Sequence, residues 1–369
     1  MTMSRLTASL ICALLSLLGA NLALAGNVAV GSCKPTLPSY PTISAAVASA
    51  PAGSTVEICP GSYYEQVFIN QSLNLNGITS GNSSDVVIYP PASGLSSLTD
   101  ISGFVLAPGV VVNAGPVNIS NVTVDGNGYQ NSGASCVGIF YNDGVSGTVN
   151  GVTVRNQNCG HPAYDSGLWA NTSTSSTLAV ENSSFHDIGD SSVDATGGIN
   201  LTLKGNTLEA SGYNAQIFTA QLTMTGNVIV GGGCCTGLSV AYSQGTVSGN
   251  TIDNTYQGIW AQGGSSLEFT RNNLSNLSTG IVIDGSSGDT YKFNTIARTG
   301  VAIDFNCNTS TVTSNIIREA KEGFDYVPAS FAGTNTFNSV ANIRNDGCAD
   351  AQTRLKPEKQ GVPMPAPSH

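Results

Sequence analysis

The chain has 369 residues, of which 40% are hydrophobic and only 10% charged, and 43 are glycine. This composition supports a long buried core with many tight turns, and it excludes a helix-rich globular domain. The formal net charge of −10 argues against binding to nucleic acid or to anionic membrane, because both reward clustered Lys and Arg. A polyanionic sugar is disfavoured too, unless a cation or a local Arg bridges it.

Residues 1–25 have the features of a secretory signal peptide. Arg5 gives a positive start, an apolar run follows over residues 6–18, and Ala23-Leu24-Ala25 forms a small-x-small cleavage site before Gly26. The apolar run is too short to span a bilayer, which takes about 20 residues. We therefore expect a secreted or periplasmic protein without a membrane span, and we exclude this segment from the fold.

The mature chain is expected to begin with a short capping helix. Thr42 is placed as its N-cap, and residues 51–53 end it. Its apolar face would consist of Ile43, Ala46 and Val47. Such a helix would cover the open end of a stack of strands, where a core and unpaired strand edges are otherwise exposed. The first strands are expected at residues 55–58, 67–69 and 73–75.

The segment Pro60-Gly61-Ser62-Tyr63-Tyr64-Glu65 resembles the Gly-x-Tyr-x-Glu sequence near the start of pectin methylesterases and many β-helix repeat proteins. With the repeats behind it, the chain from about residue 40 to 345 resembles right-handed parallel β-helix proteins of the pectin-lyase-like fold. This resemblance implies the fold but no single activity, since the fold hosts lyases, hydrolases, esterases, epimerases and adhesins. The catalytic signatures of pectin methylesterases, polygalacturonases and pectate lyases are missing from the sequence.

Each repeat also holds a strand, usually introduced by glycine, in which side chains alternate in direction. The residues expected to point inward are Ile139, Leu168, Val193, Ile217, Leu238, Ile259 and Ile281. The outward column is then Phe140, Trp169, Asp194, Phe218, Ser239 and Trp260.

Aromatic side chains in a column, spaced by ~4.8 Å, suit the stacking of sugar rings. Phe140, Trp169, Phe218 and Trp260 are therefore candidate substrate-binding residues, and both tryptophans are expected to be partly exposed. The alternative is that a loop or a partner covers the column, so that these aromatics are simply core.

Two long insertions adjoin the column. One lies between Val124 and Ile139, and the other between Val154 and Leu168. Functional residues on a β-scaffold tend to lie on such loops. The insertions carry His161, Tyr164 and Asp165, and we assign the last two as further candidate substrate-binding residues.

The next repeat supplies acidic residues beside histidine. Paired carboxylates suit glycoside hydrolysis, and a carboxylate group suits the hard cation of a lyase. The candidate catalytic residues are Asp194, Asp187, Asp190, His161 and His186. We expect Asp194 and either Asp187 or Asp190 to act as acid and base, with His161 assisting. No cofactor is expected except calcium in the case of a lyase, and no metal ligand is assigned. The alternative is that Asp187 and Asp190 form turns and the histidines are ordinary surface groups.

A short motif that contains asparagine recurs every 20–23 residues through the second half of the chain. This period is too short for a helix pair and fits one turn of a β-solenoid. In such a coil the Asn occupies a tight turn, bonds to the backbone and to the Asn stacked above, and precedes a buried aliphatic residue. The repeated positions are Asn206, Asn227, Asn250, Asn272, Asn294, Asn315 and Asn335, with Leu208, Ile229, Ile252, Leu274, Ile296, Ile317 and Phe337 beneath them.

The cysteines support a disulfide framework. Without residues 1–25, which contain Cys12, an even number remains, as expected for an exported chain. The spacing favours three pairs: Cys33 with Cys59, Cys136 with Cys159, and Cys307 with Cys348. The vicinal Cys234-Cys235 is left either as a strained ring or as free thiols. No C-x-x-C pair or His spacing supports zinc.

These observations predict an all-β, single-domain right-handed parallel β-helix of about ten coils over residues 26–348, with a short N-terminal capping helix. Residues 349–369 are Pro-rich and polar and are expected to form a disordered tail. The leading function is a monomeric protein that binds or acts on a polysaccharide or cell-wall glycan, by hydrolysis or elimination if it is an enzyme. The alternative is a non-catalytic structural or adhesive surface protein.

Overall fold

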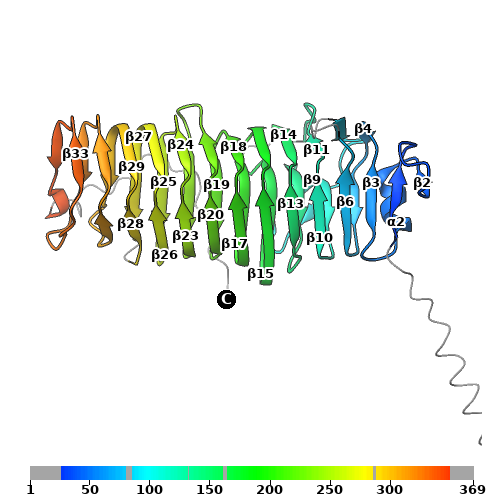
Figure 1. Cartoon of the computed structure of the whole chain (residues 1–369), viewed down its shortest axis with the longest axis horizontal. Coiled ribbons are helices and arrows are strands. Elements are labelled where there is room, and N and C mark those ends of the chain that lie inside the picture. The colour runs from blue at the N-terminus through cyan, green and yellow to red at the C-terminus, as the bar shows by residue number, and fades with distance from the viewer. Residues whose placement is uncertain (1–25, 80–84, 132, 161–163, 286–287, 350–369) are drawn as a thin grey trace, which may run out of the picture.

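A computed structural model describes residues 26–79, 85–131, 133–160, 164–285 and 288–349. The chain winds as one long coil of short strands (Figure 1). Every strand pairing is parallel except for one antiparallel hairpin, β8 (Leu98–Thr99) with β9 (Val105–Val112). In the described part of the chain no helix has the length and apolarity needed to cross a membrane. The predicted parallel β-helix is thereby confirmed.

The pairings fall into three stacks, which we call the first, second and third sheets. The first sheet contains β5 (Val67–Ile69), β9, β12 (Ser135–Tyr141), the starts of β15 (Ser166–Glu181) and β17 (Ser191–Lys204), β19 (Tyr213–Phe218), β22 (Thr236–Ala241), β25 (Gln257–Gln262), the ends of β27 (Asn273–Asp284) and β29 (Thr295–Asp304), β32 (Glu322–Asp325) and β34 (Asn342–Arg344).

The second sheet contains β1 (Val28–Val30) with β2 (Ser39–Tyr40) at its edge, β3 (Thr55–Ile58), β6 (Leu73–Gly77), β10 (Val117–Ser120), β13 (Gly147–Asn150), the ends of β15 and β17, β20 (Gln221–Thr225), β23 (Gln244–Ser248), β26 (Ser266–Thr270), β28 (Thr290–Lys292) and β30 (Thr311–Thr313). The third sheet contains β4 (Gly61–Tyr64), β7 (Val86–Tyr89), β11 (Thr123–Asp125), β14 (Thr153–Gln157), β16 (Ser184–Ile188), β18 (Thr207–Ala210), β21 (Val228–Val230), β24 (Thr251–Asp253), the starts of β27 and β29, β31 (Ile316–Arg318) and β33 (Thr336–Asn338).

The seven repeated asparagines form a continuous hydrogen-bonded line, the Asn ladder, at the turn between the second and third sheets. Nδ2 of each of the first six donates to the Oδ1 of the next Asn at 2.9–3.0 Å. Each Nδ2 also donates to a backbone carbonyl, and the backbone N–H of each of the first six donates to the same Oδ1. The predicted line is confirmed.

The aliphatic residues beneath the Asn ladder are in register with one another through the third sheet. Six of them are fully buried, and Phe337 at the C-terminal end is partly buried against the core. Among the described residues, the main hydrophobic core runs inside the coil from Val28 to Val327. Because side chains alternate along each strand, the residues between these core positions point outward.

The predicted capping helix is present as α2 (Ile43–Ser49). The side chain of Thr42 accepts a hydrogen bond from the N–H of Ala45, and Ile43, Ala46 and Val47 are buried. The Glu of the Gly-x-Tyr-x-Glu segment has a structural part here: the Glu65 carboxylate accepts hydrogen bonds from the N–H groups of Ile43 and Ser44, each at 2.8 Å. A carboxylate at a helix N-terminus is stabilised by the free N–H groups and the helix dipole.

The three predicted disulfides are confirmed. Their Cα atoms lie 5.7 Å apart for Cys33–Cys59, 5.9 Å for Cys136–Cys159 and 5.3 Å for Cys307–Cys348. Cys234 and Cys235, whose state the sequence left open, are bonded to each other. Bonded cysteines are typical of proteins outside the reducing cytosol. The predicted signal peptide and most of the predicted tail lie outside the described residues.

Candidate active site on the first sheet

The first sheet contains the predicted column of outward-facing residues, but the pairing register differs from the prediction at one strand. Phe140 pairs with Trp169 and Trp169 with Asp194, as expected. Asp194 then pairs with Gln216, and Phe218 pairs with Thr196, two residues further along. The prediction that Phe218 lies next to Asp194 is therefore wrong. Phe218 still faces outward, because a register shift of two residues keeps a side chain on the same face of the sheet and moves it along the strand. The column continues as Ser239, Trp260, Val282, Asp304 and Asp325.

The expectation that Trp169 is partly exposed is wrong. Its exposed fraction is 1%, as is that of Phe140. The ring of Phe104 lies over Trp169 with centroids 5.4 Å apart, and the ring of Tyr164 lies 6.4 Å away. Phe104 belongs to the segment between β8 and β9, so a loop covers this end of the column. Trp260, four coils further on, is partly exposed as expected, and its indole N–H donates to Asp284 at 3.3 Å.

Asp100, which sequence reasoning missed, holds this covering loop in place. One of its oxygens accepts from the N–H groups of Ser102 and Phe104. The other accepts from the indole of Trp169 at 3.1 Å and from the side chain of Asn171 at 3.0 Å. The sequence Asp-Ile-Ser is typical of an Asp-nucleated turn, but nothing in it indicates that the turn lies over Trp169, 69 residues later.

Two of the predicted carboxylates, Asp190 and Asp194, lie at the start of β17 and interact electrostatically. Burial raises the pKa of Asp190 to about 6, and repulsion from Asp165 adds to the effect. Asp194 is 2% exposed, and burial raises its pKa well above the usual value, helped by the charges of Asp190 and Asp100. Both carboxyl groups therefore keep their protons to a higher pH than an exposed Asp does.

Polar side chains connect Asp190 to the neighbouring strand. The hydroxyl of Ser191 donates to an Asp190 oxygen at 3.2 Å, and it lies 3.4 Å from the Gln216 side-chain oxygen. The N–H of Tyr213 donates to the backbone carbonyl of Asp190 at 2.8 Å. The phenol of Tyr213 has a raised pKa, chiefly because of burial and then because of the Asp190 charge.

Buried polar atoms without a hydrogen-bond partner gather on the same two strands. Among the described residues six such side-chain atoms occur, and four of them belong to β17 and β19. They are Ser192 Oγ, Asp194 Oδ2, Thr196 Oγ1 and Asn214 Nδ2. Unsatisfied buried groups are rare in folded proteins, and a concentration of them calls for a reason such as catalysis or an additional polar occupant.

The other expected site residues take different places. Asp165 is buried and accepts hydrogen bonds from the N–H groups of Cys136 and Cys159 at 2.7 and 3.0 Å, so it joins the two long insertions. Tyr164 packs edge-on against Phe104. His161 lies outside the described residues.

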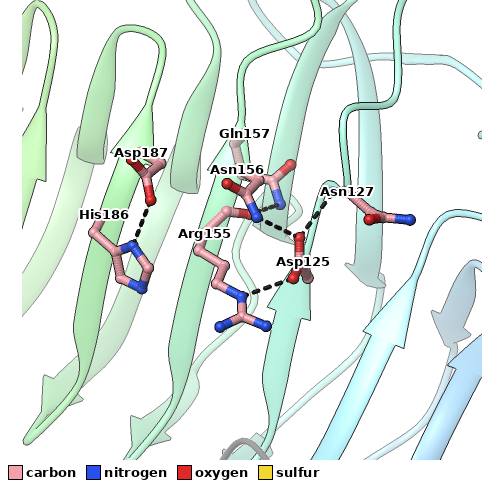
Figure 2. A network of polar contacts seen from close by, with 7 residues as sticks. All are labelled: Asp125, Asn127, Arg155, Asn156, Gln157, His186 and Asp187. Carbon is pink, nitrogen blue, oxygen red and sulfur yellow. Dashed lines mark hydrogen bonds and ion pairs between the residues drawn. The ribbon is translucent and has the colours of Figure 1, made fainter.

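His186 and Asp187 belong to β16 in the third sheet, and not to the first sheet with Asp194. Nδ1 of His186 lies 2.7 Å from an Asp187 oxygen, and both side chains are partly exposed. Figure 2 shows this pair next to Arg155, whose strand pairs with β16. The structure therefore separates the expected acid and histidine group into two sets on different sheets.

The calcium expectation gains no geometric support at Asp194. In the part of the chain that the structure describes, one group of three potential ligand atoms lies within 4.8 Å: Cys136, Cys159 and Asp165. The two cysteines of that group form a disulfide with each other, so they are not available as thiolates.

A second acidic group, also missed by sequence reasoning, lies further along the same column. Burial raises the pKa of Asp304 to about 6, and the charges of Asp325, Asp284 and Glu322 contribute. The column continues from Trp260 through Val282, so extending it by two coils would have found Asp304, and by three coils Asp325. Two shallow surface hollows lie on other parts of the molecule, around Val312 and around Glu268, and contain neither acidic group.

A family model described as "Right handed beta helix region" matches residues 108–274 and 219–355. These segments cover more than half of the chain, so the protein belongs to the right-handed β-helix family. No curated protein sequence matches the chain significantly.

Among solved structures, the chain is similar to the GH136 lacto-N-biosidase from Eubacterium ramulus, with a TM-score of 0.57 and 9% identity. The match covers 79% of this chain and 62% of that one, so the chain spans less than two thirds of its length. The DFA-IIIase from Arthrobacter chlorophenolicus A6 gives a TM-score of 0.47 at 13% identity, covering 82% and 80% of the two chains. The pectin methylesterase PemA from Erwinia chrysanthemi gives 0.44 at 12% identity, covering 69% and 90%. Identities this low show the fold alone.

Proposed function

We propose that the mature chain is a secreted carbohydrate-active protein that cleaves a glycosidic bond on the outer face of the first sheet. The observation that carries the proposal is the buried Oδ2 of Asp194, which has no hydrogen-bond partner, in a carboxyl group whose pKa is raised and which interacts with Asp190, whose pKa is about 6. A protonated carboxyl with an unpaired oxygen is suited to donate, and an ionised neighbour is suited to accept a proton.

In this proposal Asp194 is the acid and Asp190 the base. The buried, unpaired polar atoms of Ser192, Thr196 and Asn214 are further hydrogen-bonding groups on the same two strands. Along the following coils the column continues through the buried Gln216 and Ser239 to the partly exposed Trp260. The chain's negative charge favours a neutral glycan over a polyuronate.

The test is a screen of the purified mature protein on a panel of polysaccharides, with Asp190→Asn and Asp194→Asn as variants. Both hydrolysis and elimination release reducing ends, and only elimination leaves an unsaturated product that absorbs ultraviolet light. Each variant is expected to lose turnover by a hundredfold or more, because general acid–base catalysis contributes roughly 10²–10⁴-fold.

Asp304→Asn is the matched control. Asp304 also has a pKa of about 6 and belongs to the same column, five coils from Asp194. It is therefore ~24 Å away at ~4.8 Å per coil. The control is expected to keep full turnover. Equal loss in Asp304→Asn and Asp190→Asn, or full activity in Asp190→Asn, contradicts the assignment.

A second candidate is a non-catalytic structural or adhesive protein. The specific observation in its favour is that Phe140 and Trp169 are buried in a cluster of their own with Leu106, Val111 and Val137. In that case the panel yields no product, and glycan binding, where present, is insensitive to Asp190→Asn.

A further inference from the structure

The outer face of the third sheet carries a second line of side chains that the proposed reaction does not use. Tyr64 pairs in register with Tyr89, Asp125 with Arg155, and Arg155 with His186. Val124 pairs with Ile88, so the next residues on these two neighbouring strands, Asp125 and Tyr89, are also in register. The line therefore crosses five successive coils, or four steps of ~4.8 Å, about 19 Å. This length accommodates several sugar rings.

The aromatic end of the line is open to solvent. Tyr64 is 63% exposed, and its ring stacks on that of Tyr89 with centroids 5.1 Å apart and an angle of 21° between the planes. β4, which carries Tyr64, is the first described strand of the third sheet. An exposed phenol ring that is held in one orientation offers both a flat apolar surface and a polar hydroxyl.

The polar end of the line is held by a buried carboxylate. Asp125 is 4% exposed and accepts from Arg155 Nε at 2.7 Å, from the Asn156 side chain at 2.7 Å and from the Asn127 N–H at 2.8 Å. Figure 2 shows the two terminal nitrogens of Arg155 turned away from Asp125. His186 is held in a similar way, with Nδ1 against Asp187. The side chains of Arg155 and His186 are each about one-third exposed.

Each basic side chain of the line lies against a carboxylate. Arg155 has Asp125 as its partner and His186 has Asp187, whose side chain is 64% exposed. No net positive charge therefore remains to attract an anion, and the whole chain carries −10. A sugar acid would meet the carboxylate of Asp187, whereas neutral hydroxyl groups can accept from Arg155 and His186 without repulsion.

We propose that Tyr64, Tyr89, Arg155 and His186 form a second binding site, which takes a neutral oligosaccharide on the third sheet. One ring of the oligosaccharide stacks on Tyr64, and hydroxyl groups of rings further along the oligosaccharide bond to Arg155 and His186. The inference rests on the proposed function in one respect, namely that the ligand is a glycan. The site itself lies on a different sheet from Asp190 and Asp194 and does not depend on turnover.

The test measures binding by calorimetry with full-length mature protein carrying Asp190→Asn, so that the ligand is not consumed. The probes are cellohexaose, laminarihexaose, xylohexaose, mannohexaose and chitohexaose, with hexagalacturonate as the acidic probe. Adding Tyr64→Ala is expected to weaken binding of the preferred neutral hexasaccharide by about threefold to tenfold, the range for losing one aromatic stacking contact. Adding His186→Ala is expected to weaken it as well.

Tyr242→Ala is the matched control. Tyr242 is 65% exposed and follows β22 at the edge of the first sheet, so it removes the same side chain from a different face. It is expected to leave affinity unchanged. Equal affinity in the Tyr64→Ala and Tyr242→Ala proteins overturns the inference, and so does the absence of binding to every neutral probe or tighter binding of hexagalacturonate.

The same variants separate this inference from the proposed reaction. In the chain with an intact Asp190, the control Tyr242→Ala is expected to leave turnover of short oligosaccharides unchanged. Binding that depends on Tyr64 in a protein without turnover supports the third-sheet site and retires the catalytic proposal. Turnover that depends on Asp190, together with binding that does not change in Tyr64→Ala, supports the catalytic proposal and retires the third-sheet site.

Discussion

Replacing one residue of the Asn ladder tests how the coils are held together. The Asn272 side chain takes part in four hydrogen bonds: Nδ2 donates to the Val247 carbonyl and to Asn294, and Oδ1 accepts from the backbone and side chain of Asn250. Asn272→Ala removes all four. Asn294 keeps the backbone N–H of Asn272 as a partner, and the Asn250 amide keeps the carbonyl of Met224.

Two buried backbone groups then lose a partner, the N–H of Asn250 and the carbonyl of Val247. Each unsatisfied buried group costs about 1–3 kcal/mol. We therefore expect Asn272→Ala to lower the free energy of unfolding by roughly 2–6 kcal/mol. The measurement is denaturant unfolding followed by circular dichroism, with the wild-type chain in parallel.

The neighbouring Asn273 provides the control. Its side chain is exposed, and Asn273→Ala is expected to change the free energy of unfolding by less than ~0.5 kcal/mol, as for most surface positions. The reasoning is refuted when the two variants have the same stability, because the Asn ladder would then contribute nothing beyond turn formation.

Three further predictions follow from the core, the disulfides and the acidic groups. Leu274→Ala empties a fully buried site and is expected to cost ~2–5 kcal/mol in denaturant unfolding; a loss under half a kcal/mol would show that Leu274 is not core. Replacing both Cys136 and Cys159 by Ala opens a link between residues 23 apart and should cost about 3 kcal/mol, and peptide mapping without reduction should recover the two cysteines in one cross-linked pair. Asp190 and Asp304 have folded-state pKa values of about 6, above the ordinary 3.8. Between pH 4 and 6 the folded chain therefore binds more protons than the unfolded chain. Stability is expected to fall as the pH rises through this range. Melting temperatures across this range should show the decline, and Asp190→Asn should reduce it; a melting temperature that rises over this interval contradicts the assigned pKa values.

The fold could be predicted from the sequence because each coil repeats the same local chemistry. An Asn in a tight turn followed by a buried aliphatic residue recurs at a spacing that only a solenoid satisfies, and the structure stacks Asn206 on Asn227 and so on to Asn335. The capping helix was readable for the same reason, since Thr42 and the apolar face of α2 are local signals.

The site was harder to predict, because its environment comes from distant segments. Trp169 is covered by Phe104 and bonded to Asp100, residues that precede it by more than sixty positions and that no periodicity connects to it. Phe218 was assigned one level off because the strand period of two fixes the face and leaves the register open. Asp190 and Asp194 were found, since both lie near the start of one strand of the repeat.

The Asn ladder also makes the coils interchangeable. Every inner ladder residue accepts from the Asn before it and donates to the Asn after it, so each coil presents to its neighbours the same interface that it receives. A duplicated segment such as residues 250–271 would enter this line with its bonds satisfied on both sides and its Ile252 in the same core row. The length of the molecule can therefore change in whole turns of about 22 residues while its two ends remain as they are, which lengthens or shortens the outer faces of the sheets.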